Sequence, residues 1–277
     1  MAVFTFSPAG AQWVSIDFVE SGREFVSTIF ESYRETFNSN QIKLYFGDAT
    51  MTFAGRGLAF TTYMGELADV TAGTMTGLFV DSSGGHRVFS LTGLSISAAA
   101  LFDQVEAGNS VQAFNMLLAG HDQITGGSGN DRLYGHTGND VLRGAGGRDI
   151  LLGDAGNDDL FGGVGNDVLT GGRGQDDFVF NTAPSGSTNF DRITDFSAVD
   201  DRILLENAVF TRLAAGGLAA SQFVLGTQAQ DANDRIIYQR ATGTLWYDRD
   251  GTGAAAKVAF ADLADGTALT AADFLVI

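Results

Sequence analysis

The sequence predicts a mainly β protein built around a stack of short parallel strands. Three observations support this: a glycine-rich nine-residue period in the middle of the chain, one apolar residue at a fixed place in each period, and short alternating segments on either side. The 277 residues, 44% of them hydrophobic, are enough for a real apolar core in one large or two modest domains. We expect three regions, residues 1–116, 117–179 and 180–277.

The charge balance favours cations as partners. The chain has 33 acidic and 16 basic side chains, a formal net charge of −17. It lacks the Lys and Arg clusters that nucleic acids and anionic membranes attract, and no apolar run reaches the roughly eighteen residues of a membrane span. The acidic residues are 26 Asp and 7 Glu, and Asp favours turns and calcium loops. With no cysteine, disulfides, thiolate zinc sites and cysteine nucleophiles are excluded.

A nine-residue period runs without insertion or deletion from Leu117 to Val179. Its full units are GGSGNDRLY, GHTGNDVLR, GAGGRDILL, GDAGNDDLF, GGVGNDVLT and GGRGQDDFV, preceded by a degenerate LLAGHDQIT. Position four is always Gly, position six always Asp, and position eight always large and apolar. A flexible acidic linker, the alternative for such a tract, has no reason to keep an apolar residue at every ninth place.

Each unit has the composition of a tight turn followed by a short strand. The glycines permit positive φ angles, the Asp caps the turn, and the last three residues form a strand whose middle side chain points inward. Two units make one coil, and successive coils stack as parallel strands about 4.8 Å apart. The inward side chains then form two facing ladders, Ile124, Leu142, Leu160 and Phe178 on one side and Leu133, Leu151 and Leu169 on the other.

The same stacking places the position-six aspartates in two columns. These are Asp122, Asp140, Asp158 and Asp176 along one edge and Asp131, Asp149 and Asp167 along the other. Neighbouring carboxylates about 5 Å apart repel by roughly 3 kcal/mol per pair at an effective dielectric near 20. A hard divalent cation between each pair reverses the sign, because it takes oxygen ligands and the turns offer carboxylates and carbonyls. Three adjacent pairs in one column and two in the other predict about five calcium ions.

Residues 117–179 resemble the GGxGxDxUx nonapeptides of the repeats-in-toxin (RTX) family, the hemolysin-type calcium-binding repeats. The resemblance implies a calcium-loaded parallel β-roll, similar to a right-handed β-helix, with the position-six aspartates and carbonyls of the glycine-rich turns as ligands. The matching turn residues here are Gly126, Ser128, Gly135, Thr137, Gly144, Gly146, Gly153, Ala155, Gly162 and Val164.

The repeats depart from this pattern at a few positions. His136, Ala145 and Asp154 replace the second glycine of their units. In the leading unit, Leu117 and Leu118 stand where two turn residues belong, which weakens the first site of its column. His121 and His136 are interpreted as turn residues and not as metal ligands.

Residues 180–277 predict a β-rich extension of short strands and turns, including QFVLG, DRIIYQ, GTLWYDRDGTG and KVAFADL. They resemble the C-terminal region that follows RTX repeats in type I secretion substrates. That resemblance implies an uncleaved signal read by the export machinery, here over Asp273 to Ile277, and a last buried strand is compatible with it. Asp248, Asp250 and Gly251 resemble part of an EF-hand loop without its bidentate Glu. A further calcium and a plain turn both stay open there, as they do for Asp191, Asp195, Asp200 and Asp201.

Residues 1–116 show no repeat. The spacing of Phe25, Ile29, Tyr33 and Phe37 predicts an amphipathic helix, and the run from Ser95 to Leu118 predicts one or two more beside the first coil. QIKLYFG, MTFAGRGLAFTTYMG and GTMTGLFV predict strands. This α+β region is therefore expected to cap the open end of the roll.

The functional prediction is a secreted protein, extracellular or at the cell surface, whose repeats fold on binding calcium after type I export. The N-terminal MAVFTFSPAGAQW lacks the basic start and apolar stretch of a signal peptide, so an export signal is expected elsewhere. No HExxH, GxSxG or P-loop motif is present, which argues against an enzyme. Two alternatives stay open for residues 1–116: an adhesin-like module with a cell-surface or glycan partner, and a polysaccharide-active enzyme with an unfamiliar site.

Overall fold

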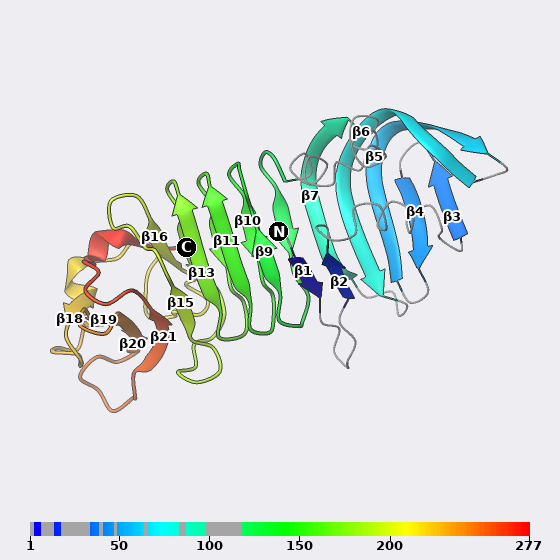
Figure 1. Ribbon diagram of the computed structural model, residues 1–277. Helices are drawn as coiled ribbons and strands as arrows, with labels where there is room; N and C mark the ends of the chain where they lie inside the picture. The colour runs from blue at the N-terminus through cyan, green and yellow to red at the C-terminus, as the bar shows by residue number, and fades with distance from the viewer. Residues whose placement is uncertain are drawn as a thin grey trace.

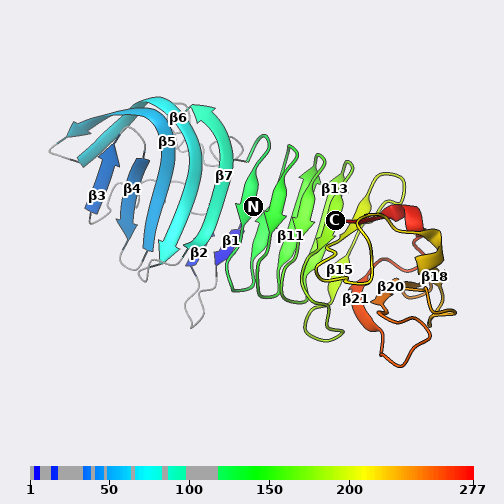
Figure 2. The ribbon, with the colours of Figure 1, turned by 180° about the vertical axis from the view of Figure 1, so that it is seen from behind.

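The computed structural model describes residues 118–277 in full and, before them, the backbone of seven strands. Those strands are β1 (Val3–Phe6), β2 (Val14–Asp17), β3 (Arg34–Asn38), β4 (Gln41–Phe46), β5 (Ala49–Tyr63), β6 (Glu66–Ser82) and β7 (Arg87–Ser97). Figures 1 and 2 show the repeats in green between the cyan strands β5 to β7 and a yellow-to-red C-terminal part. Within the described residues the protein is mainly β, as predicted.

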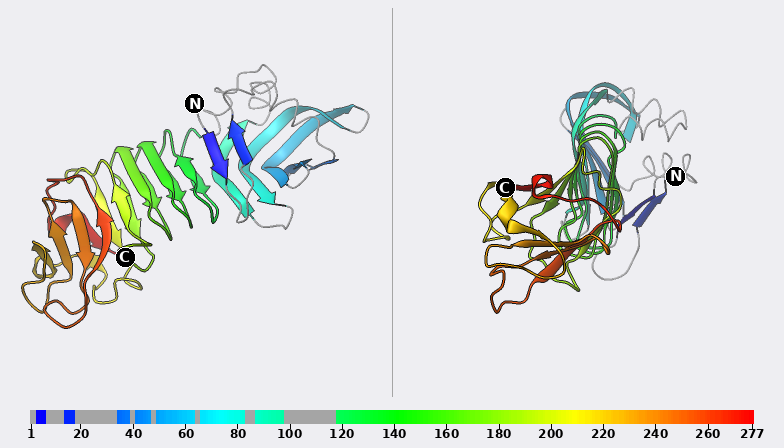
Figure 3. Two further views of the ribbon diagram at one scale, coloured as in Figure 1. Left: turned by 60° about the horizontal axis from the view of Figure 1, so that its bottom comes forward. Right: turned by 90° about the vertical axis from the view of Figure 1, so that its left-hand side faces the viewer.

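The repeats fold into two parallel sheets, and successive nine-residue units place their strands in one sheet and the other in turn. One sheet contains β8 (Gln123–Thr125), β10 (Val141–Arg143), β12 (Asp159–Phe161) and β14 (Asp177–Phe180). The other contains β9 (Arg132–Tyr134), β11 (Ile150–Ala155) and β13 (Val168–Arg173). Each coil therefore contributes one strand to each sheet. Viewed along the stack, in the right-hand panel of Figure 3, the green coils superimpose. We call residues 118–179 the roll.

The apolar residue at position eight of each unit forms the core of the roll. The register pairs residues eighteen apart, so that Leu142 lies beside Ile124 and Leu160 in one sheet, and Leu151 beside Leu133 and Leu169 in the other. All seven position-eight side chains are at most 1% exposed. Both predicted ladders are confirmed, because one large apolar side chain per three-residue strand is all that fits between the sheets.

The C-terminal extension, residues 180–277, continues both sheets. It contains β15 (Asp191–Ile193), β16 (Arg202–Leu205), β17 (Gly216–Gly217), β18 (Phe223–Leu225), β19 (Ile236–Gln239), β20 (Thr244–Tyr247), β21 (Val258–Asp262) and β22 (Phe274–Val276), with short 3-10 helices η1 (Ala220–Gln222) and η2 (Ala271–Asp273). Strand β15 adds in parallel to β13, β16 adds to β14, and β22 adds to β16. Ile193, Ile203 and Phe274 thereby prolong the two ladders at no more than 2% exposure.

An aromatic cluster fills the core of the extension. The ring of Phe260 lies edge-on to Phe180 at 5.1 Å and to Phe210 at 5.3 Å between ring centroids. Tyr247 packs edge-on against Phe210 at 5.0 Å. All four rings are at most 8% exposed. Edge-to-face pairs of this kind stabilise a core beyond the area that they bury.

The described N-terminal strands are antiparallel. Strands β3 to β7 pair in chain order, and β7 pairs with β8 at the edge of the roll, with Leu91 in register with Ile124. The predicted strands are confirmed in β4, β5 and β6. No helix among the described residues is long and apolar enough to cross a membrane.

The two N-terminal helix predictions fall largely on residues outside the described ones. Where they overlap, they are wrong: the last residues of the helix expected over 25–37 belong to β3, whose Phe37 pairs with Ile42 of β4. Residues 95–97 likewise belong to β7. Antiparallel pairing with a neighbouring strand satisfies the backbone there and overrides the weak helical spacing.

Candidate metal centre

The structure brings the seven predicted aspartates into two columns. The first Asp column contains Asp122, Asp140, Asp158 and Asp176, and the second contains Asp131, Asp149 and Asp167. In each column, Oδ1 of one Asp accepts a hydrogen bond from the backbone N–H of the Asp one coil earlier, at 2.8–3.0 Å. The carboxylates therefore tie successive coils together, and this fixes one oxygen of every Asp except Asp122 and Asp131, which begin the columns.

The second carboxylate oxygen has a different environment. All seven Asp side chains are buried, at 4% exposure or less. Within the part of the chain that the structure describes, Oδ2 is buried without a hydrogen-bond partner in six of them: Asp122, Asp140, Asp149, Asp158, Asp167 and Asp176. A buried anionic oxygen without a donor is costly, so this row of oxygens needs a positive partner.

The glycine at position one of each full unit makes room beside the Oδ2 atom. A Cβ on Gly135 would lie 2.6 Å from Oδ2 of Asp140 and 2.7 Å from the carbonyl oxygen of Gly153, one coil later. The same two kinds of oxygen crowd Gly126, Gly144 and Gly153. A carboxylate oxygen and a carbonyl oxygen thus face the same small space between adjacent coils, and neither can donate a hydrogen to the other.

The position-three carbonyls belong to the same turns. The carbonyls of Thr137, Ala155 and Val164 each accept one hydrogen bond, at 2.8–3.0 Å, from the position-four glycine N–H of the preceding coil. A carbonyl oxygen has two lone pairs, so each keeps one for a cation. Among the described residues no three His, Cys, Asp or Glu side chains gather at one point. A cation here would therefore be held by two carboxylates and completed by backbone carbonyls, a donor set that suits calcium.

The raised pKa values of the column aspartates show that their ionised form is unfavourable when no cation is bound. Burial raises the pKa of Asp149 to about 7, with smaller contributions in the same direction from the charges of Asp167 and Asp131. Burial likewise raises the pKa of Asp140 and Asp158 to about 6. Carboxyl groups in these columns hold protons more tightly than ordinary ones, because burial disfavours their charged form.

A second ladder, at position five, was not predicted from the sequence. Here the side chain accepts from the backbone N–H one coil later: Asn139 Oδ1 from Asn157, at 2.9 Å, and Asn157 Oδ1 from Gln175, at 2.9 Å. His121 takes the same place with its Nδ1, which accepts from the N–H of Asn139 at 2.8 Å. The signal was the Asn found at position five of four units. The interpretation of His121 as a turn residue fits this role.

The three substituted second glycines keep the backbone of glycine. His136, Ala145 and Asp154 have φ of 67°, 74° and 70°, in the left-handed region. Gly163 and Gly172, at the same position of later units, have φ of 98° and 103°. The turn geometry therefore survives the substitutions, at a local cost in strain.

The aspartates that the sequence left open behave in two ways. Asp191 and Asp201 extend the columns: Oδ1 of Asp191 accepts from the N–H of Asp167 at 3.0 Å, and Oδ1 of Asp201 from the N–H of Asp176 at 3.1 Å. Asp195 instead binds the turn, with its two oxygens accepting from the N–H groups of Gly171 and Gly172. Asp200 accepts from the hydroxyl of Ser197 at 3.2 Å.

The EF-hand-like segment forms a turn held by its own aspartates. Oδ1 of Asp248 accepts from the N–H groups of Asp250 and Gly251, at 3.2 and 3.0 Å, and Oδ2 of Asp250 accepts from Ala255 at 2.9 Å. These bonds form a turn, while Oδ1 of Asp250 is buried without a hydrogen-bond partner.

Comparison with known proteins agrees with this geometry. The family model for the RTX calcium-binding nonapeptide repeat matches residues 118–151 and 143–178. Residues 118–178 are RTX calcium-binding repeats. Their two parallel sheets and Asp columns are consistent with a calcium-binding β-roll.

Two solved structures with matching segments are subunits of a mannuronan C5-epimerase from Azotobacter vinelandii. The AlgE6R3 subunit is 25% identical, with a TM-score of 0.27, over 57% of this chain and 78% of that one. The AlgE6R2 subunit is 25% identical, with a TM-score of 0.37, over 55% of this chain and 91% of that one. No curated protein sequence matches the chain.

Proposed function

We propose that the chain is an exported calcium-binding protein whose RTX roll folds when it meets calcium outside the cell. The observation that carries this proposal is the row of six buried Oδ2 atoms without a donor, five of them beside a position-one glycine. In the proposal, the position-six aspartates and the position-one and position-three carbonyls hold the ions. Bound calcium supplies the positive charge that the columns lack, and the backbone N–H groups keep each carboxylate oriented toward it.

The size of the effect makes calcium a switch for folding. A site with a dissociation constant near 0.1 mM, within the range of extracellular calcium modules, contributes about 1.4 kcal/mol in millimolar calcium and almost nothing at submicromolar levels. Five such sites would contribute roughly 7 kcal/mol, comparable to the whole stability of a small domain. The repeats would then be unfolded in a low-calcium cytosol and folded outside.

The direct test is a calcium titration of the full chain followed by far-UV circular dichroism. We expect a cooperative gain of β-structure that a chelator reverses and that magnesium at the same concentration does not reproduce, because Mg²⁺ dehydrates reluctantly and demands a stricter octahedral shell. A spectrum that stays the same from chelator to millimolar calcium would contradict the proposal.

The proposed export route is type I secretion, read from the segment Asp273 to Ile277. In the folded chain Phe274 and Val276 are 2% exposed, within β22 of the roll's sheet, so the predicted buried strand is confirmed. A receptor could reach these side chains only before the chain folds, which fits repeats that stay unfolded at low calcium. The test is export from cells that carry a type I exporter: replacing Phe274 and Val276 by Ser should reduce secretion, and unchanged secretion would contradict this route.

The proposed role of residues 1–116 is to cover the open end of the first coil. The antiparallel pairing of β7 with β8 supports it, because an uncovered β8 would leave a row of unpaired backbone groups. The test is removal of residues 1–116. Self-association of the shortened chain in calcium is expected, and a fully monomeric product would contradict the role.

A further inference from the structure

One row of apolar residues crosses both the roll and the N-terminal strands. Leu91 of β7 is in register with Ile124 of β8, the first member of a core ladder of the roll. The same row continues through consecutive strand pairs from β7 back to β3. Residues paired across neighbouring strands share a face of the sheet, so this row falls on the inner face, which carries the core of the roll. Its members in the N-terminal strands are Phe37, Ile42, Phe53, Leu78 and Leu91.

A second row on the same face is also apolar. Leu44 pairs with Met51, Met51 with Val80, and Val80 with Phe89. Each of these residues is two positions from the first row in its own strand, and residues two apart in a strand share a face. The N-terminal strands β3 to β7 therefore form a sheet whose inner face is apolar over at least two rows.

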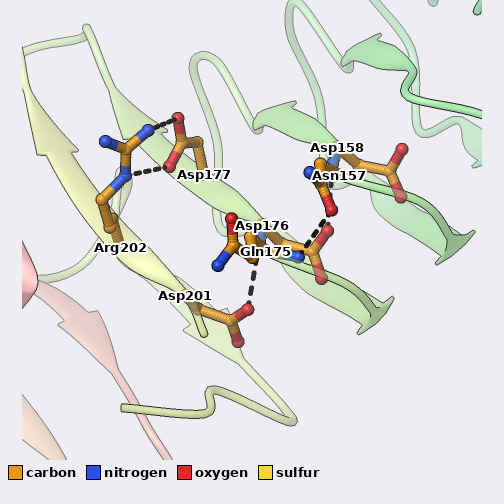
Figure 4. A network of polar contacts seen from close by, with 7 residues as sticks. All are labelled: Asn157, Asp158, Gln175, Asp176, Asp177, Asp201 and Arg202. Carbon is orange, nitrogen blue, oxygen red and sulfur yellow. Dashed lines mark hydrogen bonds and ion pairs between the residues drawn. The ribbon is translucent and has the colours of Figure 1, made fainter. Parts of the chain in front are cut away.

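The opposite face of the same sheet has a more polar composition. In the roll, Asp177 turns to the other side of the sheet from Asp176 and binds Arg202 at 2.8 and 2.6 Å (Figure 4). The outer row that crosses β3 to β8 contains Thr36, Lys43, Thr52, Phe79, Ser90 and Thr125. The inner face is therefore the one that needs a cover.

The second sheet stops before it can supply that cover. In the roll, the inner face of the first sheet packs against the second sheet, whose end strand is β9. The first sheet continues past β8 for five more strands, β7 to β3, and no described strand is hydrogen-bonded to the second sheet beyond β9. A contiguous apolar face of this size is seldom left uncovered in a soluble protein, so another element is required there.

The N-terminal hairpin lies where the second sheet stops. Among the described strands, β1 and β2 pair with each other alone, and β1 lies beside β9 (Figures 1 and 2). Phe4 pairs with Ile16 and Phe6 with Val14, which places these four residues on one face of the hairpin. This apolar face of the hairpin is matched by a more polar face, which contains Val3, Thr5, Ser15 and Asp17. The hairpin thus has the alternation of an antiparallel element that buries one face.

We propose that the β1–β2 hairpin continues the second layer of the roll beyond β9, with its apolar face packed on the inner face of β7 and β6. Two strands about 4.8 Å apart match the width of two strands of the facing sheet, where Leu91 and Leu78 belong to the apolar row. The inference rests on the proposed capping role of residues 1–116 and names the segment that performs it. It makes the hairpin part of the core that closes the first coil.

The experiment places a photo-reactive side chain on each face of the hairpin, in the full chain with calcium. Benzoylphenylalanine replaces Phe4, on the apolar face, in the test variant and Thr5, on the opposite face, in the control. After irradiation and digestion, mass spectrometry identifies the linked peptides. We expect the Phe4 variant to link to peptides of β6 or β7 within one chain, and the Thr5 variant to lose these links.

Amide hydrogen exchange gives a second readout from two identical substitutions. Val14→Ser alters the apolar face of the hairpin, and Val3→Ser alters the opposite face. Val14→Ser should speed exchange in β1 and β7 about tenfold, the effect of losing one buried valine on local stability. Val3→Ser should leave exchange in β7 as it is in the wild type.

The outcomes separate this inference from the role on which it rests. Cross-links from the Phe4 variant to a second chain, seen as dimers on a denaturing gel, would assign the inner face to a second copy and overturn the inference. Equal linking by the two photo-reactive variants, or equal exchange in Val14→Ser and Val3→Ser, would overturn it too. The capping role is judged by removal of residues 1–116: self-association of that shortened chain would uphold the role even where the hairpin variants show no effect.

Discussion

The roll and the C-terminal extension continue the same two sheets but are stabilised by different interactions. In the roll, each unit buries one apolar side chain and one carboxylate, and six of those carboxylates keep an oxygen without a donor. In the extension, aromatic rings pack against one another, and turn aspartates such as Asp234 and Asp273 accept two backbone or hydroxyl hydrogen bonds each. Within the described residues, six unpartnered carboxylate oxygens lie in the roll and one, Oδ1 of Asp250, lies in the extension. The difference indicates that the requirement for a cation is concentrated in the roll.

The largest expected effect comes from the aromatic core of the extension. Phe260→Ala removes a ring that contacts both Phe180 and Phe210, and it should lower the free energy of unfolding by about 3–5 kcal/mol. The shift should be similar with calcium and with chelator. Urea unfolding followed by Trp246 fluorescence, in a chain with Trp13 replaced by Phe, measures it. A loss that appears only in calcium would remove the distinction between the two regions.

The next effect lies inside the roll. Asp149 shares two adjacent pairs of the second column, with Asp131 and with Asp167, whereas Asp131 begins the column and shares one. Asp149→Ala should therefore remove two calcium sites, about 3 kcal/mol of stability in millimolar calcium, and Asp131→Ala one site, about 1.4 kcal/mol. Isothermal titration calorimetry and calcium-dependent melting compare the two. Equal losses would contradict a stacked column.

The metal-free roll should respond to pH in the direction opposite to ordinary acid denaturation. Burial raises the pKa of Asp122, Asp131, Asp140 and Asp158 to about 6 and that of Asp149 and Asp176 to about 7, from 3.8. The folded chain thus binds protons more tightly than the unfolded one, so folding is favoured as pH falls from 8 toward 5.

Calcium binding needs the ionised form and should weaken over the same interval. Circular dichroism in chelator should show more β-structure at pH 5 than at pH 8, while calorimetry shows weaker calcium binding at pH 5. Less β-structure at pH 5 than at pH 8 in chelator would contradict this prediction.

The smallest effect concerns the turns. Ala145 has φ of 74°, where an L-residue costs about 1–2 kcal/mol, while glycine loses about 0.5–1 kcal/mol through its flexible unfolded state. Ala145→Gly should therefore raise the free energy of unfolding by up to about 1.5 kcal/mol. Ala155→Gly, in strand β11 and outside the left-handed region, is the matched control and should lower it. Thermal melting in calcium should show a higher melting temperature for Ala145→Gly and a lower one for Ala155→Gly. Destabilisation by both substitutions would contradict the claim that the backbone of Ala145 is strained.

The sequence allowed the ladders and the two Asp columns, of four and three members, to be predicted because the period is local and constant. Because the repeat length is constant, the place of a residue in one coil gives the place of the equivalent residue in the next coil. The places of Asp191 and Asp201 in the columns were not predicted, because they follow Asp167 and Asp176 by 24 and 25 residues and no glycine turn precedes them. The two Asp-Arg-Ile triplets are the sequence feature that could have indicated them. The position of β22 was also out of reach, since its partner β16 lies some seventy residues earlier and no repeat relates them.

Position five illustrates another limit of reasoning from composition. Asn is common in turns, where its side chain often caps its own turn. The sequence alone does not distinguish such an Asn from one that accepts a hydrogen bond from the next coil, as Asn139 does from the N–H of Asn157. Only the stacking distance between coils decides between them.

The most direct test is amide hydrogen exchange of the full chain, with calcium and with chelator, resolved by mass spectrometry of its peptides. Chelation at pH 8 is expected to speed exchange in the strands of the roll, such as β10 to β13, by a far larger factor than in the β19–β20 hairpin of the extension. Roll peptides that stay equally protected without calcium would contradict the account.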